Sequence, residues 1–227
     1  WSSDVCSSDL LAGHRRAQTR LSQRCGSRSS STLGSIPGAE KALDRVLRNG
    51  DTMRRTVDDW LDYSLAREGR VQLAPVDLKL LVSEVSELLV PPSINGGSGP
   101  KVHVAVNSHV LAVHALTRQV FVNLLANSLK YAAPGQDPIV WITSEPMGRH
   151  FVRVDVTDNG IGIPPGEENR IFEPFHRSPG VRDHIDGSGV GLAVCRAIVE
   201  KQGGRIWASL PDDGGAQVSF TLRACDQ

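Results

Sequence analysis

The sequence predicts an α+β fold, an α/β sandwich in which a mixed sheet carries helices on one face, with a helical arm in front of it. From residue 71 onward, short alternating strand patterns are interleaved with helical patterns. The strand candidates outnumber those of a single βαβ crossover, and several are adjacent hairpins, which indicates a mixed sheet. Hydrophobic residues make up 40 % of the chain and aromatic residues only 5 %, so aliphatic side chains must build the core.

Composition divides the chain into three parts. Residues 1–36 form a doubtful or disordered leader, rich in Arg and Ser and almost without apolar periodicity. Residues 37–69 are expected to form a helical arm, because apolar positions recur at spacings of three and four from Leu43 to Trp60. Two alternatives stay open for this arm: packing on its own domain, or dimerisation as one arm of a helical hairpin. Residues 70–227 are the α/β domain.

The expected elements follow one another from residue 71. In chain order, strands are expected at 71–76, 101–106, 139–143, 151–156, 205–209 and 217–222, and helices at 78–89, 110–131 and 190–202. Asp77 is placed to cap the first helix. Residues 158–189 are rich in Gly, Pro and Asp with little periodicity, which is typical of a long functional loop.

Charge and cysteine usage exclude several classes of protein. Lys plus Arg and Asp plus Glu are both 25, so the net charge is zero and no nucleic-acid partner is expected. The four cysteines contain no C-x-x-C pair, which argues against a zinc cluster or a disulfide framework. No apolar run is long enough to span a membrane. We therefore expect a cytoplasmic location, with any membrane link made through upstream regions absent from this chain.

The helix expected at 110–131 carries the first of four segments suited to nucleotide binding. Asn123 and Asn127 are four residues apart and share one helix face, and Lys130 and Tyr131 follow. Amide oxygens can bind a hard cation such as Mg²⁺, and an ammonium group can pair with phosphate. Taken alone, the pattern also fits a solvated helix face.

The long loop contains the second and third segments. Asp158 comes directly after a strand and is followed by Gly160 and Gly162, which allow close backbone approach to a ligand. A carboxylate at a strand end can accept a hydrogen bond from an exocyclic amine, although such a sequence more often marks a turn. Phe172 and Phe175 bracket a proline, which favours an apolar hinge or an anchor on the core.

The fourth segment is the glycine-rich run from Gly187 to Leu192, just before the last helix. Glycines there leave backbone N–H groups at a helix N-terminus free to face phosphate oxygens. The spacing G-x-G-x-G differs from both the Walker motif and the dinucleotide-binding fingerprint.

The four segments, in this order, resemble the ATP-binding domain of sensor histidine kinases, in the superfamily of DNA gyrase, the large heat-shock chaperone and the MutL ATPase. N-L-L-A-N-S-L-K-Y is similar to the family's N box, D-N-G-I-G-I-P to its first glycine box, F-E-P-F to its F box and G-S-G-V-G-L to its second glycine box. The resemblance covers roughly residues 71–223. Residues 53–64 are similar to the second helix of the family's dimerisation and phosphoacceptor hairpin, of which 1–36 could hold a remnant of the first.

The resemblance implies roles for individual residues. Asp158 would accept from the adenine amino group, Asn127 would bind Mg²⁺ with Asn123 nearby, Lys130 would meet phosphate and Tyr131 would lie along adenine or ribose. It further implies that residues 176–186 form a mobile lid. The remaining nucleotide contacts that it implies are Gly160, Gly162, Ile163, Phe172, Phe175, Gly187, Ser188, Gly189, Val190, Gly191 and Leu192.

The same resemblance implies an ATP- and Mg²⁺-dependent protein histidine kinase. Such a kinase phosphorylates a histidine of its own homodimer and passes the phosphoryl group to an aspartate in the receiver domain of a response regulator. His14 is the candidate acceptor, but Arg15 and Thr19 stand where the family motif has an acidic residue and a proline. The first alternative is an ATP-binding, kinase-inactive dimeric regulatory module. The second is a relative that phosphorylates a serine on a partner, which the long arm disfavours.

Overall fold

The computed structural model describes residues 71–90, 99–178, 187–211 and 213–225, and the structural statements below concern these residues. In chain order the elements are β1 (Ala74–Asp77), α3 (Leu78–Leu89), β2 (Lys101–Ala105), β3 (His109–Ala112), α4 (His114–Lys130), β4 (Ile139–Met147), β5 (Phe151–Asp158), the 3₁₀ turn η2 (Arg170–Phe172), α5 (Gly191–Lys201), β6 (Ile206–Ser209) and β7 (Ala216–Ala224). The predictions for residues 1–36 and 37–69 lie outside the described residues.

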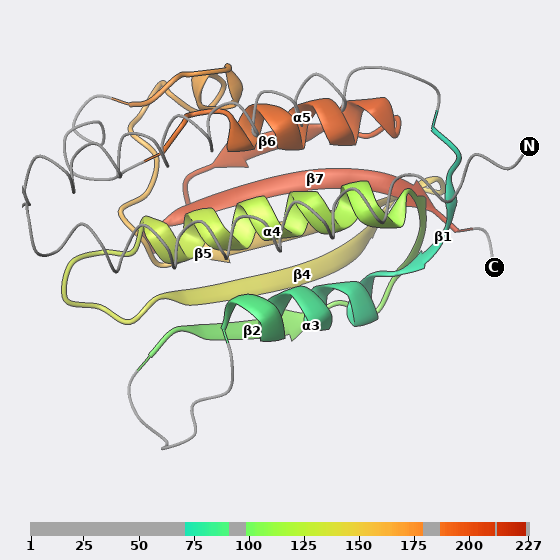
Figure 1. Ribbon diagram of the computed structural model, residues 1–227, viewed down its shortest axis with the longest axis horizontal. Coiled ribbons are helices and arrows are strands. Elements are labelled where there is room, and N and C mark those ends of the chain that lie inside the picture. Colours follow the sequence, from blue (N-terminus) through green and yellow to red (C-terminus); the bar gives the residue numbers. More distant parts are fainter. Residues whose placement is uncertain (1–70, 91–98, 179–186, 212, 226–227) are drawn as a thin grey trace, which may run out of the picture. The chain divides into compact units, whose positions relative to one another are not determined.

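The strands form one mixed sheet in the order β1-β3-β7-β5-β4-β2, with β6 paired to β7 (Figure 1). Only β2 and β4 run parallel among the described pairs. One edge of β7 pairs with β5, and the other edge is shared by β6 along its first half and β3 at its end. The predicted mixed sheet is confirmed, and β7 connects its two halves.

The helices α3, α4 and α5 lie on one face of the sheet, as predicted (Figure 1). Alternate residues of β5 supply the floor of the core beneath them, with Val152, Val154 and Val156 all at most 5 % exposed. Phe121 of α4 meets Phe220 of β7 edge to face, with ring centroids 5.6 Å apart. Apart from these two rings and Phe172, the large buried side chains of the core are mostly aliphatic, which agrees with the low aromatic content.

The predicted cap of the first helix is present. Asp77 has extended backbone angles and its side chain accepts a hydrogen bond of 3.1 Å from the Leu80 N–H. The helix that follows buries Leu78, Leu81 and Val85 on one face, because these residues recur at the helical period. The sequence therefore located the start and the buried face of α3.

The helix predicted from residue 110 starts later, so that part of the prediction was wrong. Residues 109–112 form β3, which pairs with β1 on one side and β7 on the other. Sequence periodicity could not reveal this, because Val110 and Ala112 are apolar and suit a buried strand as well as a helix. A partner distant in sequence also sets the helix start. Val113 donates its N–H to Gln202 Oε1 at 2.6 Å, where a local side-chain cap is missing.

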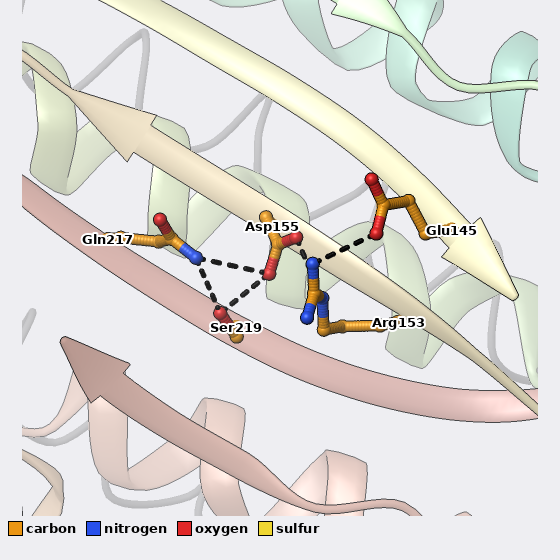
Figure 2. A network of polar contacts seen from close by, with 5 residues as sticks. All are labelled: Glu145, Arg153, Asp155, Gln217 and Ser219. Atoms are coloured by element: carbon orange, nitrogen blue, oxygen red, sulfur yellow. Dashed lines mark hydrogen bonds and ion pairs between the residues drawn. The ribbon is translucent and has the colours of Figure 1, made fainter. Parts of the chain in front are cut away.

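On the face away from the helices, a polar network joins β4, β5 and β7 (Figure 2). Asp155 is only 6 % exposed and accepts hydrogen bonds from Ser219 at 2.6 Å, Arg153 at 2.9 Å and Gln217 at 3.3 Å. Arg153 also bonds to Glu145 at 3.0 Å. Because a buried carboxylate is stable only when its oxygens are satisfied, this network fixes the register of β5 against β7.

Within the described residues, no helix is both long and apolar enough to cross a membrane.

Candidate functional site

The C-terminal end of α4 is hydrogen-bonded to residues 158–164, the first glycine segment. The Tyr131 carbonyl accepts a 3.0 Å hydrogen bond from the Ile161 N–H. A side chain at Gly160 would collide with that same carbonyl oxygen, so the two backbones touch where glycine permits it. The structure thus brings together the first two predicted segments.

Asp158 ends β5 with its carboxylate half-buried at this junction. Its Oδ1 accepts hydrogen bonds from the N–H groups of Gly160 at 2.9 Å and Ala216 at 3.3 Å. Burial raises the pKa of Asp158, and hydrogen bonds from Gly160, the Ser128 side chain and Ala216 oppose that rise. A carboxylate held by backbone donors in this way is a fixed acceptor for an amino group. Ala216 faces Asp158 across the β5–β7 pair, in the register set by Asp155 and Ser219.

Lys130 carries the cationic group of the site. A Cβ placed on Gly187 would lie 2.5 Å from the Lys130 Nζ. The ammonium group is therefore packed against residues 187–192, the second glycine segment. The same Nζ lies 5.1 Å from the centre of the Tyr131 ring. The first and fourth predicted segments are therefore adjacent, although 57 positions separate Lys130 from Gly187 in the sequence.

The two asparagines of α4 have different surroundings. The Asn123 amide accepts a 3.1 Å hydrogen bond from Gln119 and donates one of 3.2 Å to the carbonyl of Gly191. It therefore joins α4 to the first residue of α5. The half-buried Asn127 side chain makes no hydrogen bond to another described residue. Of the two amide oxygens, that of Asn127 is the better placed to bind a cation.

The two phenylalanines of the third segment also differ. Phe172 is 2 % exposed and lies under the Arg196 guanidinium, 4.6 Å from the ring centre. Phe175 is 50 % exposed and has a φ of 64°, which is uncommon for a bulky residue. Its N–H donates to the Gly189 carbonyl at 2.9 Å. Phe172 is an anchor in the core, whereas Phe175 joins the F box to the second glycine segment.

Gly189 is required at this contact. Its φ is 73°, and a Cβ there would lie 2.9 Å from the His176 carbonyl oxygen and 3.0 Å from the carbonyl carbon of Phe175. The next residues lead into α5: the Val190 N–H donates to Ser188 Oγ at 3.3 Å, and the helix starts at Gly191. The helix N-terminus is therefore at the end of the domain where Lys130 lies.

The connection between β6 and β7 also contacts the site, which the sequence motifs did not indicate. A Cβ on Gly162 would lie 2.9 Å from the Gly215 carbonyl oxygen. Gly215 in turn approaches the Asp158 backbone so closely that it cannot carry a side chain without rearrangement. From the sequence, the adjacent glycines at 214–215 indicate only a turn between the last two strands, because their position says nothing about this contact.

Sequence reasoning also missed Arg177. Burial raises the pKa of Tyr131, and the positive charge of Arg177 opposes that rise. The available signal was its position directly after F-E-P-F-H. His14 and most of the predicted lid lie outside the described residues. In the part of the chain that is described, no three His, Cys, Asp or Glu side chains gather to hold a metal ion.

Residues 113–225 match the protein family described as "Histidine kinase-, DNA gyrase B-, and HSP90-like ATPase". The sandwich fold and the junction of both glycine segments with α4 therefore form an ATPase domain of this class. The chain is 33 % identical over 202 residues to the adaptive-response sensory kinase SasA of Synechococcus sp. (strain CC9902), covering 85 % of this chain and 50 % of that protein. This domain belongs to the histidine kinase-type ATPase family, which confirms the family predicted from the four motifs.

Solved structures agree with this family. The catalytic domain of histidine kinase ThkA has 28 % identity and a TM-score of 0.55, covering 68 % of this chain and 99 % of that one. Full-length ShkA, in complex with AMPPNP, has 26 % identity and a TM-score of 0.65, covering 84 % of this chain and 40 % of ShkA. The chain spans half or less of the length of the curated relatives SasA, KdpD and FixL.

Proposed function

We propose that this chain is the catalytic part of a two-component histidine kinase that binds ATP with Mg²⁺ and phosphorylates a histidine of its own dimer. The phosphoryl group then passes to an aspartate in the receiver domain of a response regulator. The observation that carries the proposal is the contact of Lys130 with Gly187, since it sets a cation against a glycine-rich helix start. The relationship to SasA supports the same activity.

The arrangement supports a position for each part of the nucleotide. Asp158 would accept a hydrogen bond from the adenine amino group, and Tyr131 would lie along the base or ribose. Lys130 and the backbone N–H groups before α5 would meet the phosphates, because both carry positive charge or partial charge at one end of the domain. Because the Lys130 ammonium group lies close to the backbone at Gly187, both could face the same phosphate group.

Mg²⁺ would be held by Asn127 together with oxygens of the phosphates themselves. The half-buried amide of Asn127 fits this role, because its oxygen makes no hydrogen bond to another described residue. When bound, the ion supplies neutralisation of the charge that develops on the transferred phosphoryl group. Lys130 contributes further positive charge, and the chain's own part in the reaction is positioning.

In the proposed transfer, a neutral imidazole nitrogen bonds to the γ-phosphorus while the bond from that phosphorus to the bridging oxygen of ADP breaks. His14 is the candidate acceptor, and the helical arm 37–69 is the candidate dimer contact. Both are proposals from the sequence. The departures at Arg15 and Thr19 favour the alternative of an ATP-binding, kinase-inactive dimeric module, because arginine cannot act as the base that an acidic neighbour provides.

Labelling with γ-³²P-ATP tests the proposal, using the full-length gene product and this chain in parallel. The kinase gives a label that is lost in acid and kept in base, and His14→Gln removes it. Nucleotide affinity is measured separately by calorimetry. ATP binding without any label in the full-length protein would establish the inactive module instead. A base-labile, acid-stable label would indicate serine phosphorylation, and absence of ATP binding would refute both nucleotide-dependent functions.

A further inference from the structure

Glu167 lies just after the first glycine segment, and its carboxylate bonds to three other side chains. Its backbone makes a turn from Pro164, to whose carbonyl the Glu167 N–H donates at 3.1 Å. Its carboxylate accepts from Arg170 Nη1 at 2.7 Å and from Ser178 Oγ at 3.2 Å, and it also bonds to His176 Nε2. No sequence motif singled out this residue, and the proposed transfer chemistry does not use it.

Two of these partners lie on either side of Arg177. His176 and Ser178 both bond to the same carboxylate oxygen, Oε2. A single atom of Glu167 therefore fixes the chain immediately before and immediately after the arginine. Because both flanking residues are held, the direction in which Arg177 leaves the backbone is constrained as well.

The held segment faces the nucleotide site. The His176 backbone packs on Gly189 of the second glycine segment, where a Cβ would come within 2.9 Å of its carbonyl oxygen. The charge of Arg177 acts on Tyr131 at the end of α4. We call the contacts of Glu167 with His176 and Ser178 the clamp. The clamp thus joins the loop after the first glycine segment to a segment that packs on the residues proposed to hold ATP.

The inner part of the clamp differs from an ordinary surface ion pair. The Glu167 and His176 side chains are both only 11 % exposed, and Ser178 is 8 % exposed. Arg170 is 54 % exposed and adds little, since exposed pairs are screened by water. The hydrogen bond from His176 lowers the pKa of Glu167, so the carboxylate is ionised at neutral pH.

We infer that Glu167 is a positioning residue for the nucleotide site: by binding His176 and Ser178 it holds the segment that carries Arg177 against the second glycine segment, from which the guanidinium adds positive charge to the ATP pocket. This inference rests on the proposed ATP binding. Glu167 itself does not contact the nucleotide. It acts through Arg177, and its effect must therefore vanish when Arg177 is absent.

The test is a double-mutant cycle on the full chain, with Mg-ATP affinity measured by calorimetry. Glu167→Ala is expected to weaken binding about tenfold, which corresponds to about 1.4 kcal/mol. Glu167→Gln keeps acceptor and donor atoms in the clamp and is expected to stay within about threefold of the wild type. Glu168→Ala is the matched control, because it removes the same charge from a neighbour that bonds only to the Gly166 N–H among the described residues.

The decisive variant combines Glu167→Ala with Arg177→Ala. If Glu167 acts through Arg177, the double variant binds ATP within about twofold of Arg177→Ala alone. The inference would be overturned if the affinity losses of the two single variants multiplied in the double variant. Glu167 would then support the fold independently of Arg177. Wild-type affinity in Glu167→Ala would overturn it too, while leaving the proposed function intact. A wild-type chain that binds no ATP would instead refute the proposed function.

If Glu167→Ala does not fold, a second pair of variants tests the inference: Ser178→Ala alone and Ser178→Ala combined with Arg177→Ala. Ser178→Ala removes one side of the clamp and leaves the carboxylate with its other partners. A loss of about threefold is expected when Arg177 is present and none when it is replaced. Equal losses in both backgrounds would contradict the positioning role.

Discussion

The two ends of the α4–α5 helix pair use polar side chains in opposite ways. At the end where α4 begins, Gln202 is 2 % exposed and bonds to the Val113 N–H, the Thr117 hydroxyl and the Ile198 carbonyl. At the other end, Asn127 is only half-buried, and Lys130 is exposed and lies against Gly187. Asn123 lies between the two ends and joins the helices through Gly191.

This difference separates groups that stabilise the domain from groups that serve a ligand. A buried amide with its hydrogen bonds satisfied contributes to stability, and removing it leaves other buried groups without partners. Exposed polar groups contribute little to folding. They are expected to act when a ligand binds. Variants at the two ends should therefore change different measurements.

Replacing Asp158, which is fastened to the ligand end, should give the largest effect on binding. Asp158→Ala removes the fixed acceptor for the adenine amino group, and ATP affinity should fall more than about 100-fold. The melting temperature should change little, because the carboxylate is only half-buried. Calorimetric titration with ATP checks the first result and thermal unfolding the second. The exposed Asp213→Ala is the matched control, and retained affinity in Asp158→Ala would refute the adenine assignment.

Breaking the structural end should reverse that pattern. Gln202→Leu leaves the buried Val113 N–H and Thr117 hydroxyl without their acceptor, and about 2 kcal/mol of unfolding free energy should be lost. The folded fraction should still bind ATP as the wild type does. Denaturant titration measures the loss. Gln119→Leu is the control on the half-exposed side of α4 and should cost less than about 0.5 kcal/mol. A weakened ATP affinity in Gln202→Leu would mean that the two ends are coupled.

A smaller change at the ligand end concerns the contact of Lys130 with Gly187. Gly187→Ala places a methyl group 2.5 Å from the Lys130 Nζ, and the flexible lysine is expected to move away. ATP affinity should fall about five- to tenfold with an unchanged melting temperature. In the background of Lys130→Ala the same methyl group should have no effect on the measured affinity. A persisting loss there would show that the alanine disturbs the loop rather than the lysine.

The pH dependence of stability offers the smallest and most specific contrast. The pKa of Asp158 is raised above 3.8 because burial disfavours its charge. The folded state thus gains from the neutral carboxyl below pH 3.8, and that gain is lost as the pH rises through the raised pKa. At pH 7 Asp158→Asn should therefore melt at a higher temperature than the wild type. The difference should vanish below pH 3.8 in thermal scans, and a stabilisation that persists there would refute the burial explanation.

Motifs indicated the segments that meet around Lys130 far better than the contacts at the Gln202 end. The four segments were recognisable because glycines and polar residues at these spacings interrupt the hydrophobic pattern. The cap of α4 by Gln202 could not be predicted, since it joins residues 89 positions apart and glutamine has no strong positional preference. Likewise, β3 was assigned to the helix, because its apolar residues suit either element until its neighbours in the sheet are known.

Within the site, the sequence indicated which segments meet but not how their side chains are used. Asn123 and Asn127 looked equivalent at a spacing of four, yet one bonds to Gly191 and the other does not. Phe172 and Phe175 looked like one hinge, yet one is buried and the other is exposed. Glu167 and Arg177 gave no signal beyond their charge, because their roles depend on contacts formed only after the loops fold back on each other.

The central place of β7 in the sheet has a consequence for synthesis. A ribosome delivers β7 after every other described element, yet β5, β6 and β3 all need it as a partner. Until residues 216–224 leave the exit tunnel, β3 and β5 have no strand between them, and Asp158 has no hydrogen bond from the Ala216 N–H. In a nascent chain this part of the sheet must therefore stay incomplete until residues 216–224 have emerged, and only then can Asp158 accept its second backbone hydrogen bond.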